Sequence, residues 1–513
     1  MKLDRNKYLE SRSLKPRTLL IAIVSVNILL GLVVAIFPRE GISLGGGQKL
    51  KFVSFSELSG QGDTLKEVNI DEVLAGVSPL EEDGSSADSL VVKNPKEQIE
   101  PAKDTVRKHT TAYVVRRSLQ LPVNNPNALR TLLHGLKNES KTKVVRILHY
   151  GDSQLEGDRI TDYFRNKMQR RFGGKGPGIL LPNEPAASAR ISAYVSCSNN
   201  IKKRAIYVNG SKAPDGKYGI GGAVFEISGD NNHFKEWRVA DTDSNQRIPV
   251  FSGETQANAY IQVKNGYYGY SLARKYDKTT LLYECDEHFI VNVRRDSLVK
   301  DYVLLPSKGL ATYKWDQGAE KKLKLSFTKG KFPKIYGLAL DGDKGVAVDN
   351  FAMRGSSAVG FDKMDHQLYS KQLNEMNVCA IFLQYGINVV PHVKSDYNYY
   401  KNILIKQLKS IKAAHPGVSI VVIGPSDMSR NNGGNMVSYS NIPLIRDAMK
   451  EAAFETGCCF WDLYEAMGGE NSMSAWVSKG LAQKDYTHFS YKGAKYVGEM
   501  LFNAIMEQVE RDL

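Results

Sequence analysis

A serine hydroxyl, a histidine imidazole and an aspartate carboxylate are the candidates for chemistry in this sequence. Ser153 lies in LHYGDSQLEGDRIT, residues 148–161, directly after a short apolar run. A serine attacks an ester only when a neighbouring base accepts its proton, and that base needs an acceptor that holds its tautomer. We therefore look for a histidine with a carboxylate partner.

Histidines with an aspartate nearby are scarce. Of the 9 histidines, His233 and His488 have an aspartate three residues before them. Asp230 and His233 lie in the polar stretch SGDNNHF, whereas Asp485 and His488 lie in KDYTHFSYKGA, a loop that leads directly into an apolar helical pattern. A D-x-x-H pattern arises by chance in about every second chain of this composition, so context selects between the two pairs. We take Asp485 and His488 as the candidate partners of Ser153.

A strand, a tight turn and a helix are predicted around Ser153. KVVRILHY, at 143–150, is a short β-branched run, and residues 157–174 carry apolar side chains on one helical face until a Gly-Gly pair ends the pattern. A further helix is predicted over 125–138, where Leu and Ala recur with helical spacing. This succession is typical of the opening unit of a parallel α/β sheet.

Segments predicted as strands and helices alternate again after residue 333. Strands predicted from KIYGLAL, NVCAIFLQYG, SIVVIGPS and CFWDL alternate with helices predicted from YNYYKNILIKQLKSIKAAHPG, IPLIRDAMKEAAFETG and SYKGAKYVGEMLFNAIMEQV. Strands that alternate with helices favour a parallel sheet covered on both faces. The fold class predicted for residues 121–190 together with 333–513 is therefore α/β, with a three-layer α/β/α parallel sheet.

Residues 191–332 lack this alternation of strands and helices. Short alternating stretches such as AVFEIS, AYIQVK, TTLLYE and HFIVNVRR are separated by Gly, Asn, Asp and Pro. This alternation is typical of antiparallel strands with one buried face. It predicts an inserted antiparallel β-sandwich module.

An uncharged apolar run extends from Leu19 to Phe37. At 1.5 Å per residue, a helix of this length covers about 28 Å, close to the hydrocarbon thickness of a bilayer. Residues 1–17 carry more Lys and Arg than Asp and Glu, which favours a cytoplasmic tail. We expect residues 18–38 to be a retained transmembrane anchor in the lipid bilayer of a bacterial inner membrane, with the following chain in the periplasm. A cleavable signal peptide is the alternative. Residues 39–120 are rich in Gly, Ser, Pro and charge and are predicted to be a tether.

Composition argues against several function classes. The 513 residues are 42% hydrophobic and 24% charged, enough to bury more than one core. The net charge of +14 is spread along the chain without a basic helix or zinc spacing, so nucleic acid is not an expected partner. The 5 cysteines are too few for a disulfide scaffold. Cys197 and Cys285 could pair, whereas Cys458 and Cys459 are interpreted as buried strand residues.

Neither a cofactor nor a metal is expected. The sequence has no phosphate loop, zinc pattern or nucleotide fingerprint. Asp341, Asp343 and Asp349 lack the loop spacing and terminal glutamate of a calcium site and are interpreted as a turn. Asp152, next to the candidate nucleophile, is interpreted as a structural acceptor for its turn rather than as a second catalytic acid.

Four short blocks resemble, in order, the signature blocks of the SGNH (GDSL) hydrolases. They are GDSQ after the first strand, RGSSA after GVAVDNFAM, QYGIN after VCAIFL, and DYTHFS before the last helix. The resemblance covers residues of about 125–190 and 333–513 and implies a flavodoxin-like sheet. By this resemblance Ser153 is the nucleophile, His488 is the general base and Asp485 is the carboxylate that orients it.

The resemblance also implies an oxyanion hole. The backbone N–H groups of Ser153 and Gly355 and the side-chain amide of Asn388 would donate to the oxyanion, each contributing about 3 kcal/mol in the transition state. The family usually continues its third block as Gly-x-Asn-Asp, whereas this sequence has Val389 after the asparagine. The donor asparagine is retained and the following carboxylate is lost, which weakens inference about the geometry of that loop.

The inserted β module, together with MRGSSAVGF and DSQLEGDRIT, resembles the bacterial cell-wall branch that includes peptidoglycan and polysaccharide O-acetylesterases. This implies an exported serine esterase whose substrate is an acetylated glycan and which forms an acyl-enzyme on Ser153. Two alternatives stay open. A glycan O-acetyltransferase would use the same triad with a sugar hydroxyl in place of water, and a non-catalytic glycan-binding protein would use the scaffold alone. A lipase is disfavoured because no long apolar lid accompanies the blocks.

Overall fold

The computed structural model describes residues 16–36, 42–45, 48–50, 68–79, 117–184, 190–229, 232–240, 243–253, 258–266 and 268–512. The chain divides into two compact units, residues 1–67 and residues 68–513. The first unit contains helix α1 (Pro16–Ile36) and the antiparallel pair β1 (Ile42–Gly45) and β2 (Gln48–Leu50). Across the described residues, we find no helix that combines the length and the apolarity needed to cross a bilayer. The anchor expected at 18–38 stays a prediction.

Five parallel strands form the central sheet of the second unit, in the order β17-β3-β18-β19-β22. They are β3 (Val144–Gly151), β17 (Gly345–Ala352), β18 (Val378–Gln384), β19 (Ser419–Ile423) and β22 (Cys459–Trp461). Almost every residue of these strands is buried, which explains their near-continuous apolar sequences. The predicted parallel sheet is confirmed.

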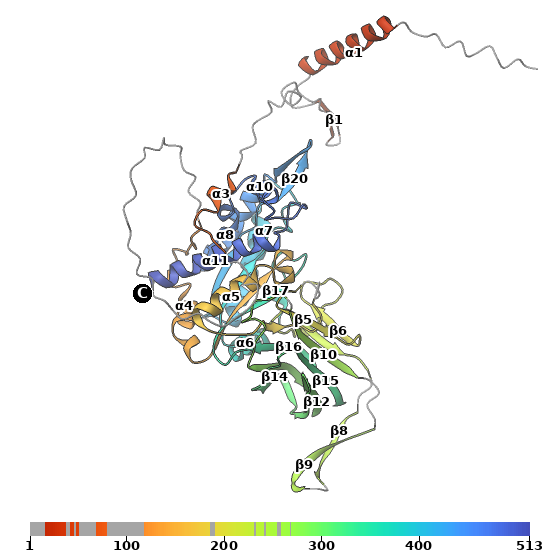
Figure 1. Cartoon of the computed structure of the whole chain (residues 1–513), viewed down its shortest axis with the longest axis vertical. Coiled ribbons are helices and arrows are strands. Elements are labelled where there is room, and N and C mark those ends of the chain that lie inside the picture. Colours follow the sequence, from red (N-terminus) through yellow and green to blue (C-terminus); the bar gives the residue numbers. More distant parts are fainter. Residues whose placement is uncertain are drawn as a thin grey trace, which may run out of the picture. The chain divides into compact units, whose positions relative to one another are not determined.

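Helices cover both faces of this sheet (Figure 1). One buried cluster joins Ile147 of β3 to side chains of helices α4, α5 and α11, and the other joins its neighbour Leu148 to side chains of α6, α7 and α8. Successive strand residues point to opposite faces, so the sheet lies between two helical layers. The longer helices are α4 (Arg130–Lys137), α5 (Thr161–Phe172), α6 (His366–Glu375), α7 (Asn398–Ala414), α8 (Ile442–Glu455) and α11 (Tyr491–Arg511). Shorter ones are α3 (Ile70–Val73), α9 (Leu463–Ala466), α10 (Ser472–Ser478) and the 3-10 turns η1 (Glu139–Lys141), η2 (Ser153–Asp158) and η4 (Phe361–Lys363).

Two antiparallel sheets form the β module, as predicted. One has the order β13-β12-β15-β10-β5 and the other β14-β11-β16-β7-β6, with β4 beside β16. The strands are β4 (Gly178–Leu180), β5 (Ala193–Cys197), β6 (Ile201–Ala205), β7 (Ala223–Ile227), β10 (Ala259–Asn265), β11 (Lys278–Cys285), β12 (Phe289–Arg295), β13 (Leu298–Leu304), β14 (Ser307–Trp315), β15 (Lys322–Gly330) and β16 (Lys334–Asp341). Ring contacts between Tyr283 and Phe289, at 5.2 Å, and between Tyr302 and Trp315, at 5.6 Å, join the two sheets face to face. A hairpin of β8 (Phe234–Ala240) and β9 (Asp243–Phe251) projects from the module (Figure 1).

The expected domain boundaries need two corrections. KIYGLAL was expected to resume the parallel sheet, but it forms β16, which pairs antiparallel with β11 in the module. Because β16 is buried on both faces, its sequence has the continuous apolar pattern of a central parallel strand. In addition, part of the predicted tether is folded into the second unit. Ile70 and Leu119 lie in its core, and Gln120 forms a bridge to Phe460.

A buried ion network fixes the start of α5 behind the turn η2. Arg165 is fully buried and donates to Asp158 at 2.8 and 3.1 Å, to Asp162 at 3.3 Å, and to the carbonyl of Val348 at 2.7 Å. Burial raises the pKa of Asp158, but the guanidinium groups of Arg165 and Arg190 and the hydrogen bond from Ser192 together outweigh it and leave the pKa below its ordinary value. The network therefore ties the end of η2 to strand β17.

Arg165→Met is expected to destabilise the fold by about 3–5 kcal/mol, because two buried carboxylates lose their main cation. Chemical denaturation followed by fluorescence measures the change. Arg170→Met, which removes an exposed arginine of the same helix, is the matched control and should shift the free energy of unfolding by less than about 0.5 kcal/mol. Equal losses in the two variants would contradict a specific role for the network.

Candidate active site

The four sequence blocks meet at the carboxyl end of the central sheet. Ser153 follows β3, Gly355 follows β17 and Asn388 follows β18, while the loop with Asp485 and His488 precedes α11. Because β17, β3 and β18 are adjacent parallel strands, their carboxyl ends lie along one edge. Residues more than 300 positions apart are thereby brought into hydrogen-bond contact.

Local backbone geometry positions Ser153. A Cβ on Gly151 would lie 2.8 Å from the carbonyl oxygen of Gln384, so only glycine fits where β3 ends beside β18. Asp152 then caps the turn, because its side chain accepts the backbone N–H of Gln154 at 3.0 Å. Ser153 opens η2 with 9% of its surface exposed. The hydroxyl thus lies at the rim of the sheet and not inside the core.

Ser153, His488 and Asp485 form a continuous hydrogen-bonded chain. The Oγ of Ser153 lies 2.8 Å from Nε2 of His488, and Nδ1 of His488 lies 2.7 Å from Oδ2 of Asp485. A carboxylate only accepts hydrogen bonds, so it holds the imidazole proton at Nδ1 and leaves Nε2 as the acceptor for the serine hydroxyl. This is the arrangement that removes a proton from an attacking serine.

The loop before α11 holds the Asp485 carboxylate in place. Its Oδ1 accepts the backbone N–H groups of Thr487 and His488, each at 3.0 Å, while Oδ2 is left for the imidazole. Tyr486 adopts a left-handed conformation with φ of 54°, which closes this tight turn. Burial raises the pKa of Asp485, but the hydrogen bonds from His488 and Thr487 outweigh it and hold the pKa below its ordinary value. The carboxylate is therefore charged at neutral pH.

Two predicted oxyanion donors lie on neighbouring loops. The side-chain amide of Asn388 donates to the carbonyl oxygen of Ser356 at 2.9 Å, which ties the loop after β18 to the loop after β17. Gly355 has φ of 78°, a conformation that favours glycine, and no atom lies within 4 Å of a Cβ built on it. The structure therefore leaves open space beside the Gly355 backbone.

Two residues that the sequence interpretation passed over brace the site. Gln154 donates to the carbonyl of Thr487 at 2.7 Å and accepts the N–H of Phe489 at 3.3 Å. It therefore binds the backbone of the histidine loop on both sides of His488. Arg159 donates to the carbonyl oxygens of Ser153 and Phe489. Gln154 belongs to the GDSQ block, but neither residue carries a sequence signal that reveals these distant carbonyl partners.

Other polar candidates lie outside the triad. Asp152 is buried, burial raises its pKa to about 7, and it accepts backbone N–H groups of Gln154 and Ile387, as expected of a turn acceptor. His233 contacts Glu287, with Nδ1 and Oε1 3.0 Å apart, and Asp230 lies outside the described residues. His233 therefore forms its contact within the β module, while Nε2 of His488 faces Ser153.

The possible disulfide and the turn proposed for the aspartates can be compared with the structure. Cys197 and Cys285 are both free thiols, and Cys458 and Cys459 are buried. Asp343 lies in the bend between β16 and β17, as the turn interpretation expects, whereas Asp341 and Asp349 lie on these strands and bind Arg146, the second of them at 2.7 Å. Over the described parts of the chain, no group of three His, Cys, Asp or Glu side chains could hold a metal ion.

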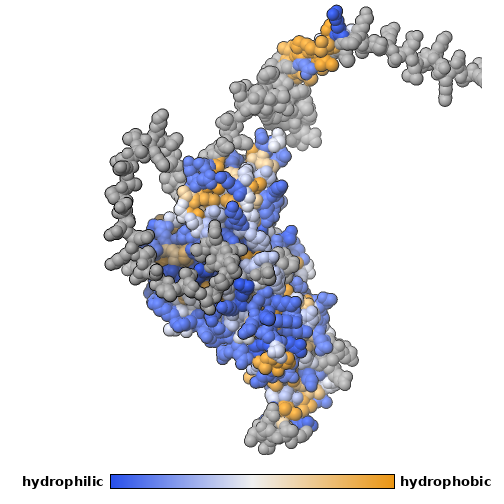
Figure 2. Space-filling model, viewed as in Figure 1, coloured by the Kyte–Doolittle hydropathy of each residue, from blue (hydrophilic) through white to orange (hydrophobic). Residues whose placement is uncertain are grey.

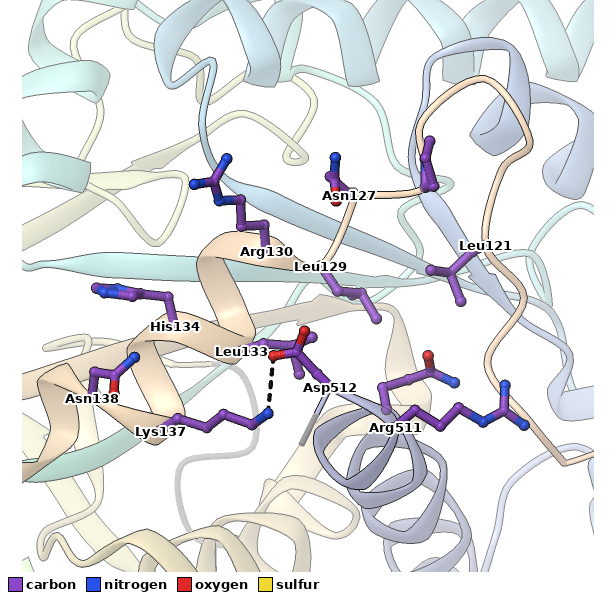
Figure 3. A pocket seen from close by; sticks show the side chains of 12 residues that line it. Leu121, Asn127, Leu129, Arg130, Leu133, His134, Lys137, Asn138, Arg511 and Asp512 are labelled. Carbon is purple, nitrogen blue, oxygen red and sulfur yellow. Dashed lines mark hydrogen bonds and ion pairs between the residues drawn. The ribbon is translucent and has the colours of Figure 1, made fainter.

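A cavity of about 440 Å³ lies away from the triad, beside the start of α4 and the end of α11 (Figure 3). Arg130, His134 and Lys137 of α4 line it, and Lys137 forms an ion pair of 2.9 Å with Asp512. None of the four sequence blocks contributes to its walls. It therefore carries no part of the candidate chemistry.

The comparisons with known proteins agree with this fold. The chain is similar to a solved structure of a peptidoglycan O-acetylesterase, with a TM-score of 0.55 and 19% identity over 74% of this chain and 96% of that one. An acetyl xylan esterase is similar over 31% of this chain and 81% of that one, with 12% identity and a TM-score of 0.25, too low to add to the argument. No family model and no curated protein matches the sequence. The first likeness shows a shared fold, in agreement with the α/β fold that the sequence predicts.

Proposed function

We propose that this protein is a serine esterase that removes O-acetyl groups from a glycan. The observation that carries the proposal is the hydrogen-bonded chain from Ser153 through His488 to Asp485, with separations of 2.8 and 2.7 Å. A structural serine does not need a histidine with its free nitrogen aimed at the hydroxyl and its other nitrogen held by a carboxylate. That constellation is the one that activates a serine for acyl transfer.

In the proposed reaction, Oγ of Ser153 attacks the carbonyl carbon of the acetyl ester while its proton passes to Nε2 of His488. The bond from the carbonyl carbon to the sugar oxygen then breaks, and the imidazolium returns the proton to that oxygen. The acetyl group stays on Ser153 until the same imidazole deprotonates a water molecule, whose oxygen attacks the acetyl carbon. The bond from that carbon to Oγ then breaks, Oγ takes the proton back from the imidazolium, and acetate leaves. Asp485 stabilises the imidazolium in both halves of the reaction.

The substrate class rests on the fold that this chain shares with the peptidoglycan O-acetylesterase. A β module beside the catalytic edge suits a polymeric glycan, since a long substrate extends beyond the ester that reacts. We also propose that the chain is exported and anchored by residues 18–38. Support comes from the uncharged run Leu19–Phe37 and from the exposed apolar side chains over α1 in Figure 2.

Acetate release tests the proposal. The full-length chain is incubated with p-nitrophenyl acetate and with O-acetylated glycan, and free acetate is measured with and without a deacetylated glycan as acceptor. Release from both substrates supports the esterase. Diversion of most acetyl groups onto the added acceptor would instead identify an acetyltransferase, and an inert chain that still binds glycan would identify a binding protein.

Asn388→Ala is expected to lower kcat by about 10²–10³-fold with little change in KM, because an oxyanion donor acts mainly in the transition state. Steady-state kinetics with p-nitrophenyl acetate measures both constants. Asn374→Ala, which changes an exposed asparagine of α6, is the matched control and should leave both constants unchanged. A rise in KM at constant kcat in Asn388→Ala would contradict the donor role.

A further inference from the structure

A cavity of about 1110 Å³ lies at one end of the β module. Its walls come from the turns that join β12 to β13 and β14 to β15, from the end of β10, from the segment before β11, and from Lys175 in the loop after α5. Pockets for small molecules typically have volumes of about 300–1,000 Å³, so this space is large enough for a complete small ligand.

The cavity borders the amino end of the central sheet, whereas Ser153 lies at the carboxyl end. The carbonyl of Lys175 accepts the N–H of Gly342 at 3.1 Å. The N–H of Asp277, another lining residue, donates to the carbonyl of Asp341 at 2.9 Å. Both contacts lie just before β17 begins, and the 8 residues of that strand cover about 26 Å up to the catalytic edge. The cavity is therefore separate from the candidate active site.

Arg295, the last residue of β12, is a buried cation in the wall of this cavity. It is 5% exposed, and the ring centre of Trp315 lies 5.7 Å from its guanidinium carbon. Nε and Nη2 are shielded and have no hydrogen-bond partner among the described residues, which leaves Nη1 as the nitrogen that can reach the cavity. The adjacent carboxylate of Asp296 instead accepts three backbone N–H groups of residues 320–322, at 2.9–3.0 Å. A buried charge without a counter-ion is costly, so Arg295 indicates that an anion binds here.

Arg274 is a second arginine of the wall, and the described residues provide no ion pair for it either. It is half-buried, and its Nε is shielded without a hydrogen-bond partner among the described residues. The carboxylate three residues further on, Asp277, instead binds Lys175, with both of its oxygens 3.1 Å from Nζ. Two guanidinium groups therefore border one cavity while the carboxylates near them bind other groups.

The charged side chains of the cavity leave an excess of two positive charges. Its cations are Lys175, Arg274, Lys275, Arg295 and Lys321, and its carboxylates are Asp277, Asp296 and Glu320. A phosphate monoester carries about −1.5 to −2 charges at neutral pH and would balance this excess, whereas a single carboxylate would balance only part of it. The planar guanidinium group also matches pairs of phosphate oxygens. The charge count therefore favours a phosphate group as the ligand.

We propose that this cavity binds a phosphorylated small molecule and that Arg274 and Arg295 hold its phosphate group. The space is far larger than a phosphate ion, so the group belongs to a larger molecule. The uncharged walls, which include Asn265 and Tyr276, contact the rest of that molecule. The site does not depend on the proposed esterase activity, because it lies at the opposite end of the central sheet.

Binding is measured on the full-length chain by isothermal titration calorimetry. The probes are glucose 6-phosphate, inorganic phosphate, glucose and acetate, all at the same ionic strength. Glucose 6-phosphate should bind most tightly and inorganic phosphate more weakly, whereas glucose and acetate should show no binding. Absence of binding with both phosphate probes, or equal affinity for acetate, would overturn the site. Inorganic phosphate that binds as tightly as glucose 6-phosphate would overturn the assignment to a larger ligand.

Substitution of the two arginines tests which groups hold the phosphate. Arg274→Met and Arg295→Met should each weaken binding of glucose 6-phosphate about tenfold or more, because each removes a charge-assisted hydrogen bond. Arg274→Lys should weaken it only about threefold, since it keeps the charge but not the planar fork. Arg294→Met, at an exposed arginine of β12 outside the cavity, is the matched control and should change nothing. Unchanged affinity in both methionine variants of the cavity would overturn the site.

Arg295→Met also has a stability readout. Without ligand, its thermal midpoint should equal or exceed that of the natural sequence, because methionine places no unpaired charge inside the module. Saturating glucose 6-phosphate should raise the midpoint of the natural sequence and leave that of the variant nearly unchanged. A lower midpoint of unliganded Arg295→Met would identify an arginine that the fold needs and would overturn its assignment to the ligand.

The site and the esterase are tested separately. Arg274→Met and Arg295→Met should both hydrolyse p-nitrophenyl acetate at the natural rate, and Ser153→Ala should still bind glucose 6-phosphate. A chain that hydrolyses the ester but binds no phosphate probe would remove the site and retain the esterase. Loss of hydrolysis in both arginine variants would contradict the separation of the cavity from the catalytic edge.

Discussion

Ser153→Ala should lower kcat for p-nitrophenyl acetate by about four orders of magnitude or more, leaving the residual rate that binding and oxyanion donors supply. The reason is chemical, since no other group beside Nε2 of His488 is expected to form the acyl-enzyme. Stopped-flow or steady-state release of p-nitrophenol measures the loss. Ser297→Ala, at an exposed serine between β12 and β13, is the control and should retain full activity.

A folded Ser153→Ala variant with more than a tenth of the activity of the natural sequence would exclude Ser153 as the nucleophile. The side chain is small and lies at the sheet rim with 9% exposure, so its loss should leave the thermal midpoint nearly unchanged. A thermal scan of the same sample therefore separates a lost nucleophile from a lost fold.

Asp485→Asn should lower kcat by about 10⁴-fold. An asparagine oxygen can still accept the N–H groups of Thr487 and His488, so the loop keeps its shape. Its amide nitrogen, however, donates where Oδ2 accepted. The imidazole must then accept at Nδ1 and carry its proton on Nε2, where it cannot receive the proton of Ser153.

The measurement for Asp485→Asn is kcat alongside thermal stability. Asp343→Asn, at an exposed aspartate that pairs with Lys278, provides a matched control that should change neither quantity. If Asp485→Asn kept kcat within a factor of ten of the natural sequence, the carboxylate would not be needed to hold the imidazole, and the proposed division of roles would be wrong.

Much of the candidate site could be predicted because each part has a local cause. The strand before Ser153 is a mostly apolar run that is almost entirely buried, and it ends in Gly151, where a side chain would meet the carbonyl oxygen of Gln384 on the neighbouring strand. In the loop before α11, hydrogen bonds join Asp485 to His488, three residues further on. The geometry of this loop therefore depends on only a few neighbouring residues. Parallel sheet topology then brings the blocks together without further information.

The remaining features depend on contacts that no local pattern encodes. Strand β16 has the sequence of a parallel strand, yet it lies in an antiparallel sheet, because burial on both faces produces the same apolar run in either setting. Arg159 and Gln154 donate hydrogen bonds to carbonyl groups more than 300 residues away, and a polar side chain in the sequence gives no indication of such distant partners. Ile70 and Leu119, in the predicted tether, belong to short apolar stretches whose burial depends on the folded surface that receives them.

Trapping the acyl-enzyme tests the central claim most directly. The full-length chain is mixed with p-nitrophenyl acetate, quenched with acid within milliseconds, digested and mapped by mass spectrometry. The proposed mechanism predicts one acetyl group on the peptide that contains Ser153, appearing with the first release of p-nitrophenol and decaying as acetate forms. Turnover with no acetyl group on that peptide at any time point, or with the group on a different residue, would contradict it.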